Sequence, residues 1–230
     1  MAADIDFWFN YSCPLSFLTR RLLLRAAQES GARIRSHPFE HRPGIRNAVF
    51  SQRVWEHTVL PLAARLDVPM GEAPPMSATD TRPASRGYRY ARDRKRGEAY
   101  SDQVFSAHFQ EQAGIGDPAV LEQLAGRAGL DPGEFRAALA ARERTEHPRP
   151  TPEEGKIPVT LTPTIVSGHL RIEGVPTAEQ FHRLLQGAGS GRLSRPGGNV
   201  RPSGRSAASD RAVCGRQDRT VVEVVECGLH

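Results

Sequence analysis

Two short apolar runs and the amphipathic segment between them open the chain. Residues 5–9 are apolar except for Asp6, with apolar side chains on both faces, which is typical of a strand buried inside a sheet. Residues 15–27 carry leucine and alanine at helical spacing and predict a helix that Gly31 ends. Residues 34–39 follow as a second strand. Strand, helix and strand in this order predict a right-handed βαβ unit with parallel strands.

The pattern then changes to helical periods alone, from about residue 45 to residue 144. Asp117 and Asp131 each precede a proline, so each pair places an N-cap acid before a proline at the first helical position. Glu134, three residues after Asp131, suits a capping box. Pro61 falls inside another helical stretch and predicts a kink there. The sequence therefore predicts an all-α block inserted into an α/β chain.

Strand periodicity returns after this block, over residues 161–166. Ser167 and Gly168 predict a hairpin turn before a second short strand at 170–172. A closing helix over residues 177–185 begins with a threonine and has a glutamine three positions later, as in a capping box. The chain thus ends its folded part on a hairpin and a helix.

Three regions follow from this pattern. A discontinuous domain of strands and flanking helices is expected over residues 1–40 and 155–188, and an inserted helical domain over residues 41–154. Residues 189–230 are rich in glycine, serine and arginine and nearly empty of large apolar side chains. Such a segment buries too little surface to offset its ordering entropy, so we expect a disordered tail.

The composition of the chain indicates the compartment in which the protein is expected. The 230 residues are 38% hydrophobic and 25% charged, and no apolar run approaches the roughly 18 residues that a membrane span needs. Asp4 and Asp6 stand where a secretory signal would be basic. The three cysteines, Cys13, Cys214 and Cys227, form no disulfide framework. We therefore expect a cytoplasmic protein without a membrane partner.

The net charge of +5 needs to be divided before it is interpreted. Residues 189–230 contain seven arginines against four acidic residues, which leaves +2 on the other 188 residues. The predicted folded part is thus close to neutral, and we expect no nucleic-acid partner.

The candidate chemistry lies where the first strand turns into the first helix. Pro14 suits the first helical position, which makes Cys13 the N-cap, with its sulfur beside free N–H groups and the positive end of the helix dipole. Such a position lowers a thiol pKa, and Arg20 and Arg21 could add positive field. A buried, inert cysteine at a helix start is the alternative interpretation.

The ordered set of motifs resembles the DsbA-like branch of the thioredoxin fold over about residues 4–187. Within this branch, the chain most resembles the FrnE-like proteins, some of which belong to bacterial aromatic polyketide pathways. The same clan includes 2-hydroxychromene-2-carboxylate isomerases and kappa-class glutathione transferases. The resemblance rests on Asp6-Phe7-Trp8-Phe9-Asn10-Tyr11-Ser12-Cys13-Pro14, Trp55-Glu56, Leu60-Pro61-Leu62-Ala63, Phe105-Ser106-Ala107-His108-Phe109, Ile115-Gly116-Asp117, Gly129-Leu130-Asp131 and Thr162-Pro163-Thr164.

This resemblance implies an α/β fold of thioredoxin type with a large inserted all-α domain. It also implies that Pro163 is cis and faces Cys13, and that the backbone of Thr162 pairs with a bound peptide or with glutathione. Pro14, Thr162 and Pro163 are then the expected binding residues, and Cys13 and Ser16 the expected catalytic ones.

One departure from the family decides how this site is interpreted. A dithiol oxidoreductase of the family has Cys-x-x-Cys, whereas this chain has Cys13-Pro14-Leu15-Ser16. The second cysteine normally resolves the mixed disulfide, and Ser16 cannot. It can instead donate its hydroxyl and its backbone N–H to the Cys13 thiolate. A resolving role for Cys214 or Cys227 would require the tail to fold back.

Three functions remain open on this basis, of which we expect the first and keep the other two as alternatives. The first is thiol–disulfide exchange through Cys13 alone, with a small-molecule or thiol substrate, in a secondary-metabolite pathway or elsewhere. The second is a glutathione-dependent or other thiol-dependent isomerase or transferase for an aromatic substrate, with Trp55, Tyr88 and Phe105 lining an apolar pocket. The third is a non-catalytic partner protein.

The expected ligands follow from the same hypotheses. We expect no permanently bound cofactor, although glutathione or another low-molecular-weight thiol could bind. A homodimer is one assembly that the sequence allows. The spacing of histidine, cysteine and acidic residues predicts no metal site. His57 and His108 lie in helical patterns and are expected to be packing or surface residues.

Overall fold

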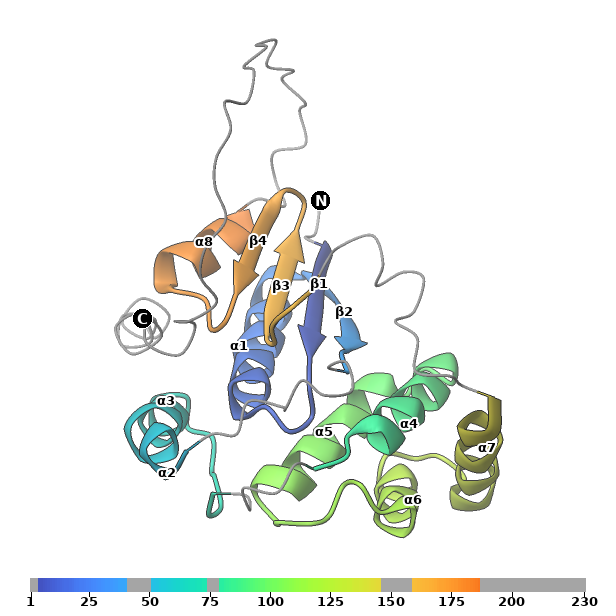
Figure 1. Ribbon diagram of the computed structural model, residues 1–230. Coiled ribbons are helices and arrows are strands. Elements are labelled where there is room, and N and C mark those ends of the chain that lie inside the picture. The colour runs from blue at the N-terminus through green and yellow to red at the C-terminus, as the bar shows by residue number, and fades with distance from the viewer. Residues whose placement is uncertain (1–3, 41–50, 74–78, 146–158, 187–230) are drawn as a thin grey trace, which may run out of the picture.

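The computed structural model describes residues 4–40, 51–73, 79–145 and 159–186. Within these residues one four-stranded sheet has the order β2-β1-β3-β4 (Figure 1). β1 is parallel to β2 and antiparallel to β3, and β3 is antiparallel to β4. This is the mixed sheet of a thioredoxin fold. The strands are β1 (Asp4–Phe9), β2 (Arg33–Pro38), β3 (Thr164–Ser167) and β4 (Leu170–Glu173).

The two faces of β1 differ more than the sequence suggested. Ile5, Phe7 and Phe9 are at most 1% exposed and point into the hydrophobic core. On the opposite face Trp8 is buried, as expected, whereas Asp4 and Asp6 pair with arginines of β2 at 3.0 and 2.9 Å. The parallel register sets each acid directly opposite its arginine, so the charges neutralise each other in place.

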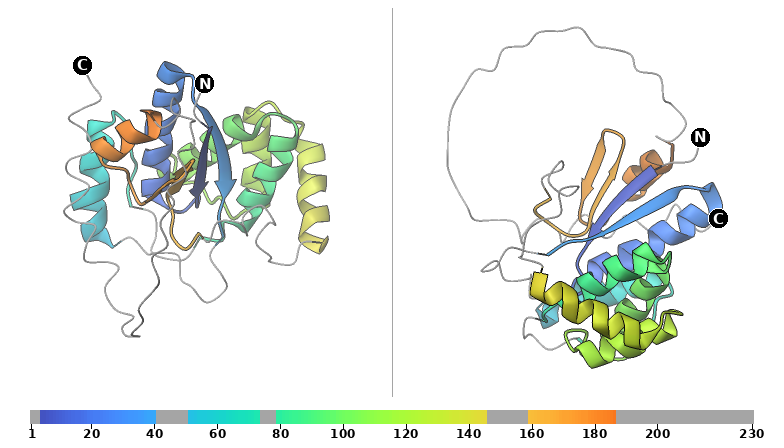
Figure 2. Two further views of the ribbon diagram at one scale, coloured as in Figure 1. Left: turned by 90° about the horizontal axis from the view of Figure 1, so that it is seen from above. Right: turned by 90° about the vertical axis from the view of Figure 1, so that its right-hand side faces the viewer.

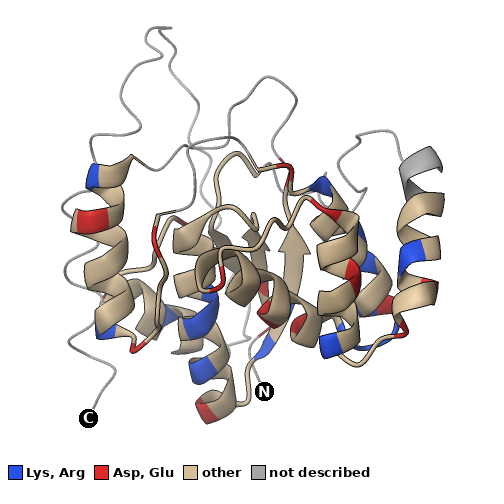
Figure 3. Ribbon diagram, turned by 90° about the horizontal axis from the view of Figure 1, so that it is seen from below, with Lys and Arg blue, Asp and Glu red and all other residues tan. Residues whose placement is uncertain are grey.

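Charged residues of both signs are likewise interspersed over the helices. Figure 3 shows basic and acidic segments alternating along the described elements rather than gathering by sign. Arg127 pairs with Glu111 at 3.0 Å and Arg136 with Glu122 at 2.7 Å, each pair joining two separate segments of the chain.

α1 (Pro14–Ser30) lies behind the sheet in the view of Figure 1. Cys13 is its N-cap, Pro14 is its first residue, and Gly31 ends it in the left-handed conformation with φ of 72°. All three assignments were predicted and are confirmed. The buried side of the helix includes Leu15, Leu18 and Leu23.

The helical block follows β2 and gathers where β1 and β2 end (Figure 2). The irregularity predicted at Pro61 takes the form of a π-helical turn. Leu60 N–H bonds to the carbonyl of Trp55, five residues back, just before the proline that has no N–H to donate. The elements are α2 (Gln52–Val54), η1 (Trp55–Val59), α3 (Leu60–Arg65), α4 (Arg82–Asp93), α5 (Gly97–Phe109), α6 (Pro118–Arg127) and α7 (Pro132–Thr145).

Several predicted caps are present. Asp117 accepts a hydrogen bond from the N–H of Ala119, and Asp131 accepts one from the N–H of Glu134. The Glu134 carboxylate does not complete a capping box; it accepts a hydrogen bond from the Tyr90 hydroxyl. Tertiary packing has thus redirected one side chain that the local pattern had assigned.

The closing hairpin and helix are present as predicted, although β3 begins three residues later than expected and the turn and α8 shift by one residue. Ser167 pairs with Leu170, so Gly168 and His169 form the turn rather than Ser167 and Gly168. Gly168 has φ of 59°, which glycine adopts readily. α8 (Ala178–Gln186) has both hydrogen bonds of the predicted capping box between Thr177 and Gln180.

An aromatic cluster joins the helical block to the sheet. Phe105 of α5 lies 5.4 Å from Phe9, 4.9 Å from Tyr11 and 5.5 Å from Phe17 between ring centroids. Phe109 stacks on Phe17 one turn later. Both parts of the chain therefore share one core. The predicted domain boundaries near residues 41 and 155, and the predicted tail at 189–230, lie at or within segments outside the described residues.

Candidate functional site

Cys13 lies at the start of α1 with its sulfur between two backbone groups. Sγ accepts a hydrogen bond from the Ser16 N–H at 3.4 Å and donates one to the Thr162 carbonyl oxygen at 3.6 Å. The Thr162–Pro163 peptide bond is cis. The structure therefore brings together all the predicted site residues: Cys13, Pro14, Ser16, Thr162 and Pro163.

Asn10 orders the turn that leads from β1 to this cysteine. Its Oδ1 accepts hydrogen bonds from the N–H and the hydroxyl of Ser12, and its backbone carbonyl accepts one from the Cys13 N–H at 3.0 Å. Its Nδ2 donates to the Phe39 carbonyl, just after β2, and to Oγ1 of Thr81, the residue before α4, which fixes the turn to both segments. Sequence analysis did not single out Asn10, although an asparagine two residues before a serine is typical of an Asx turn.

Burial changes the electrostatics that the sequence predicted for the thiol. Cys13 is 7% exposed, and this desolvation raises the pKa of its thiol above the ordinary value. The hydroxyls of Ser16 and Thr162 and the N–H groups of Ser16 and Leu15 favour the thiolate and lower this pKa, but they do not cancel the effect of burial. The expected low pKa is therefore wrong for the resting protein, because burial penalises the thiolate more than the helix start stabilises it.

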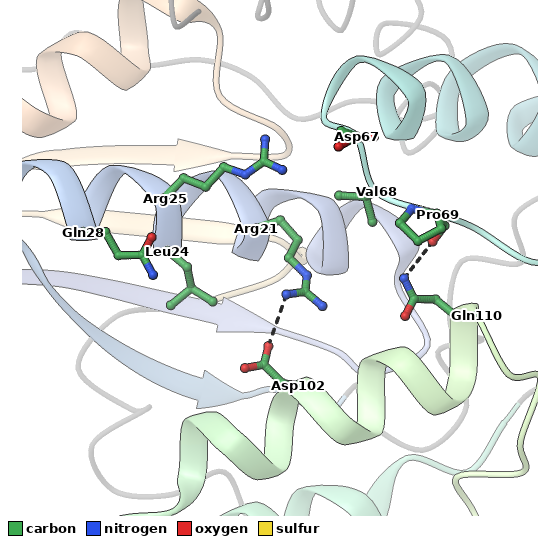
Figure 4. A pocket seen from close by; sticks show the side chains of 9 residues that line it. All are labelled: Arg21, Leu24, Arg25, Gln28, Asp67, Val68, Pro69, Asp102 and Gln110. Carbon is green, nitrogen blue, oxygen red and sulfur yellow. Dashed lines mark hydrogen bonds and ion pairs between the residues drawn. The ribbon is translucent and has the colours of Figure 1, made fainter.

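The two arginines expected near the thiol point elsewhere. Arg20 is 1% exposed and binds α5, with its terminal nitrogens on the Glu98 carboxylate at 2.8 Å and on Asp102. Arg21 lies 3.7 Å from Asp102 and lines a cavity of about 510 Å³ on the flank of α1 (Figure 4). The cavity is formed by Arg21, Leu24, Arg25, Gln28, Asp67, Val68, Pro69, Asp102 and Gln110, and Cys13 is not among its lining residues.

Ser16 lies one turn into α1 with its side chain fully buried. Its N–H is bonded to the Cys13 sulfur, but its Oγ has no hydrogen-bond partner among the described residues. A buried hydroxyl without a partner is costly, so this oxygen is ready to bond to a group that enters the site or to the thiolate itself.

The aromatic residues expected to line a substrate pocket belong to the core. Trp55 stacks on Phe109, and Phe105 is fully buried among the rings that join α5 to β1. Tyr88 donates its hydroxyl to the Ser36 carbonyl and is 3% exposed. The predicted apolar pocket of Trp55, Tyr88 and Phe105 is therefore wrong, since helical periodicity cannot tell a pocket wall from core packing.

The histidines add no catalytic group beside the thiol in the part of the chain that the structure describes. His37 bonds to Asp6 and stacks on Trp8 on the polar face of the sheet. His57 is exposed and His108 is buried, as predicted. Residues 4–40, 51–73, 79–145 and 159–186 contain no group of three histidine, cysteine or acidic residues that could hold a metal ion.

A family model decides the relationship of the chain, since the DSBA-like thioredoxin domain matches residues 4–186. The chain belongs to this family. Among the proteins similar to this DSBA-like chain is the uncharacterized protein YwbO of Bacillus subtilis (strain 168), which is 28% identical over 195 residues covering 80% of this chain and 96% of YwbO.

Solved structures share the fold of this DSBA-like chain. A probable DsbA oxidoreductase from Streptomyces coelicolor is 20% identical with a TM-score of 0.64, covering 91% of this chain and 100% of that one. A 2-hydroxychromene-2-carboxylate isomerase is 23% identical with a TM-score of 0.61, covering 80% and 91%. The cytosolic disulfide reductase DsbM of Pseudomonas aeruginosa is 19% identical with a TM-score of 0.53, covering 74% and 89%.

The described helices of this DSBA-like chain include none that is both long and apolar enough to cross a membrane.

Proposed function

We propose that this DSBA-like protein catalyses thiol–disulfide exchange through Cys13 alone, with a low-molecular-weight thiol such as glutathione as the second thiol. The observation that carries this proposal is the position of Cys13 Sγ, between the Ser16 N–H and the carbonyl that precedes the cis proline. A disulfide can meet the sulfur there while its backbone pairs beside it at Thr162.

The exchange balances without any further redox partner. The Cys13 thiolate attacks one sulfur of a disulfide R–S–S–R′, a Cys13–S–S–R bond forms, and R′ leaves as a thiolate that takes up the proton Cys13 released. The thiolate of the second thiol then attacks the R sulfur, forms a new disulfide with R, and returns Cys13 to its thiolate. Ser16 takes no part in this resolution because it has no thiol.

The carbonyl of Thr162 links substrate docking to activation of the Cys13 thiol. Its carbonyl accepts the hydrogen bond of the resting Cys13 thiol. An incoming backbone N–H that pairs with the same carbonyl competes with that thiol, which weakens the interaction that favours the protonated form. Substrate binding and ionisation of Cys13 are thereby linked.

The raised pKa of Cys13 favours reduction and exchange over strong oxidation. Strong disulfide oxidants of this fold stabilise their reduced form as a low-pKa thiolate. Burial does the opposite at Cys13, so the thiolate is scarce at rest but a strong nucleophile once it forms. This direction suits a reducing compartment, and we place the protein in the cytoplasm.

The isomerase or transferase alternative finds less support. It requires an apolar pocket over the thiol, and the three aromatic side chains predicted to form it are packed in the core. The likeness to the 2-hydroxychromene-2-carboxylate isomerase concerns the fold. A substrate from an aromatic secondary-metabolite pathway stays a prediction from the resemblance.

The test uses the full chain with Cys214→Ser and Cys227→Ser, so that Cys13 is the one remaining thiol. We expect this protein to reduce a glutathionylated peptide in the presence of glutathione, and to show a glutathione adduct on Cys13 by intact mass when glutathione disulfide is added. Cys13→Ser should lose at least about 100-fold in rate, since the nucleophile itself is removed.

Two results would overturn the proposal. One is exchange activity that survives Cys13→Ser. The other is an adduct that never forms on Cys13 although the protein is folded by circular dichroism. A third result would assign the resolving step to the tail. In that case the protein with both tail cysteines replaced is inactive, and a protein that keeps either Cys214 or Cys227 is fully active.

A further inference from the structure

Three polar atoms on one face of α1 are buried and have no hydrogen-bond partner among the described residues. They are Ser16 Oγ, Thr19 Oγ1 and Arg20 Nε. Ser16 and Thr19 are fully buried, and Arg20 is 1% exposed. Residues three and four apart are neighbours on a helix surface, so the three side chains share one patch just beyond Cys13.

General helix geometry indicates where the Nε of Arg20 lies. Helical side chains lean toward the N-terminus of their helix, so the Arg20 stem lies over the turn that contains Ser16. Its two terminal nitrogens are occupied by Asp102 and by the carboxylate and carbonyl of Glu98 on α5. The remaining N–H, on Nε, is therefore left on the side of α1.

We propose that Ser16, Thr19 and Arg20 hold one internal water molecule, and that this water connects the Arg20 guanidinium through the Ser16 hydroxyl to the sulfur of Cys13. Internal waters typically make about three hydrogen bonds to buried polar groups that have no other partner, and this patch offers three such atoms. The inference rests on the proposed function, because it makes Thr19 a positioning residue for the Cys13 nucleophile.

The donor and acceptor roles fix the direction of the relay. Arg20 Nε–H can only donate, so the water accepts from it. The water then donates to Ser16 Oγ, and the Ser16 hydroxyl donates to the Cys13 thiolate. Thr19 Oγ1 is the third partner of the water. Each bond points from the cation toward the anion, so the chain stabilises the thiolate and offsets part of the burial of Cys13.

Two carboxylates and two arginines meet beside this relay, since Arg21 of α1 also lies 3.7 Å from Asp102. Glu98 and Asp102 on α5 face Arg20 and keep it protonated. Tyr11, ahead of α1, and Tyr88 on α4 also lie near the guanidinium, and burial raises both of their pKa values far enough that they stay neutral. Arg20 thus stays charged across the pH range in which a thiol ionises.

The test removes the hydroxyl of Thr19 without changing its shape. Thr19→Val is compared with Thr19→Ser, which keeps the hydroxyl, in the chain with Cys214→Ser and Cys227→Ser. Below the titration midpoint of Cys13, we expect Thr19→Val to slow iodoacetamide alkylation of Cys13 about fivefold, the effect of one hydrogen bond, while Thr19→Ser stays near the parent. Ser36→Ala, which removes another buried and unpartnered hydroxyl on β2, is the matched control and should leave the rate unchanged.

A double variant tests the connection itself. Because Ser16→Ala already interrupts the relay, adding Thr19→Val to it should slow alkylation no further. Equal rates for Thr19→Val and the parent, or additive effects in the double variant, would overturn the proposal. If Thr19→Val does not fold, a high-resolution crystal structure of the parent decides it: a water bonded to all three atoms supports the relay, and three atoms with other partners refute it.

Alkylation needs no substrate, so its outcome is separable from that of the proposed function. If Thr19→Val slows alkylation but the protein has no exchange activity, the role of Thr19 is supported and the proposed function is refuted. If the protein has exchange activity but Thr19→Val does not change the alkylation rate, only the water-mediated relay is refuted.

Discussion

Gly87 is the position where the packing of the helical block can be tested most directly. It lies in α4, where a Cβ atom would stand closest to the Tyr100 hydroxyl oxygen, 2.7 Å from Phe135 Cζ and 2.8 Å from Tyr100 Cζ. Ordinary contacts of a Cβ atom begin near 3.4 Å. Tyr100 and Phe135 are fully buried against each other, so neither ring can move aside freely.

Two opposing effects decide the outcome of Gly87→Ala. Alanine is favoured over glycine inside a helix by about 1 kcal/mol. Overpacking of a filled core costs about 1–3 kcal/mol, and contacts this short with two fixed rings fall at the upper end of that range. We therefore expect a net loss of about 2 kcal/mol, which lowers the melting temperature of a chain of this size by roughly 4–8 °C.

Thermal unfolding by circular dichroism measures the loss, and two further variants make it specific. Gly114→Ala is the control, because a Cβ there meets nothing within 4 Å, and its melting temperature should stay within about 1 °C of the parent. Tyr100→Phe removes the hydroxyl nearest to the new methyl group, so Gly87→Ala should cost less in that background. An unchanged or raised melting temperature for Gly87→Ala would refute the packing of α4, α5 and α7 described above.

Two other predictions concern the thiol and a buried histidine. Ser16→Cys places a second thiol one turn from Cys13, where the helix start allows a disulfide without backbone movement. We therefore expect a several-fold gain in insulin reduction, which the control Ser12→Cys should not show. No gain, with the new disulfide confirmed by mass, would contradict an oxidoreductase site. Burial lowers the pKa of His108 from 6.5 to about 4, against a backbone hydrogen bond with Ala113. The unfolded chain therefore binds the extra proton first, and stability present above pH 6.5 should fall by up to about 3 kcal/mol as the pH drops toward 4. His108→Phe should flatten urea-unfolding free energies over this window, and an equal slope in both proteins would refute it.

The parts of the structure that the sequence predicted well are those fixed by neighbours in the chain. The cap at Cys13, the caps at Asp117 and Asp131 and the capping box at Thr177 each need only a few consecutive residues. Their hydrogen bonds form within the same turn, whatever the rest of the molecule does. The order of elements, together with the resemblance to the family, gave the thioredoxin fold.

Errors occur where a distant element decides the outcome. Arg20 follows Cys13 within two turns, yet its guanidinium binds Glu98 and Asp102, about 80 residues later in the chain. Trp55 and Phe105 have the helical spacing of a pocket wall and of a core equally, and only the position of α5 against β1 separates the two. Asn10 was missed because its main partners, the carbonyl of Phe39 and the hydroxyl of Thr81, come together only in the fold.

Cys13 is the residue at which local and tertiary effects oppose each other. The start of α1 offers its sulfur an N–H donor and the positive end of the helix, which favour the thiolate. Burial in the hydrophobic core favours the neutral thiol, and in the resting protein burial prevails. Under the proposed function, the protonated thiol is protected from oxidation until a substrate backbone pairs with Thr162 and competes with the S–H group for the Thr162 carbonyl. The proposal therefore assigns both half-reactions to Cys13 alone, because the docking that brings in the disulfide also favours formation of the thiolate.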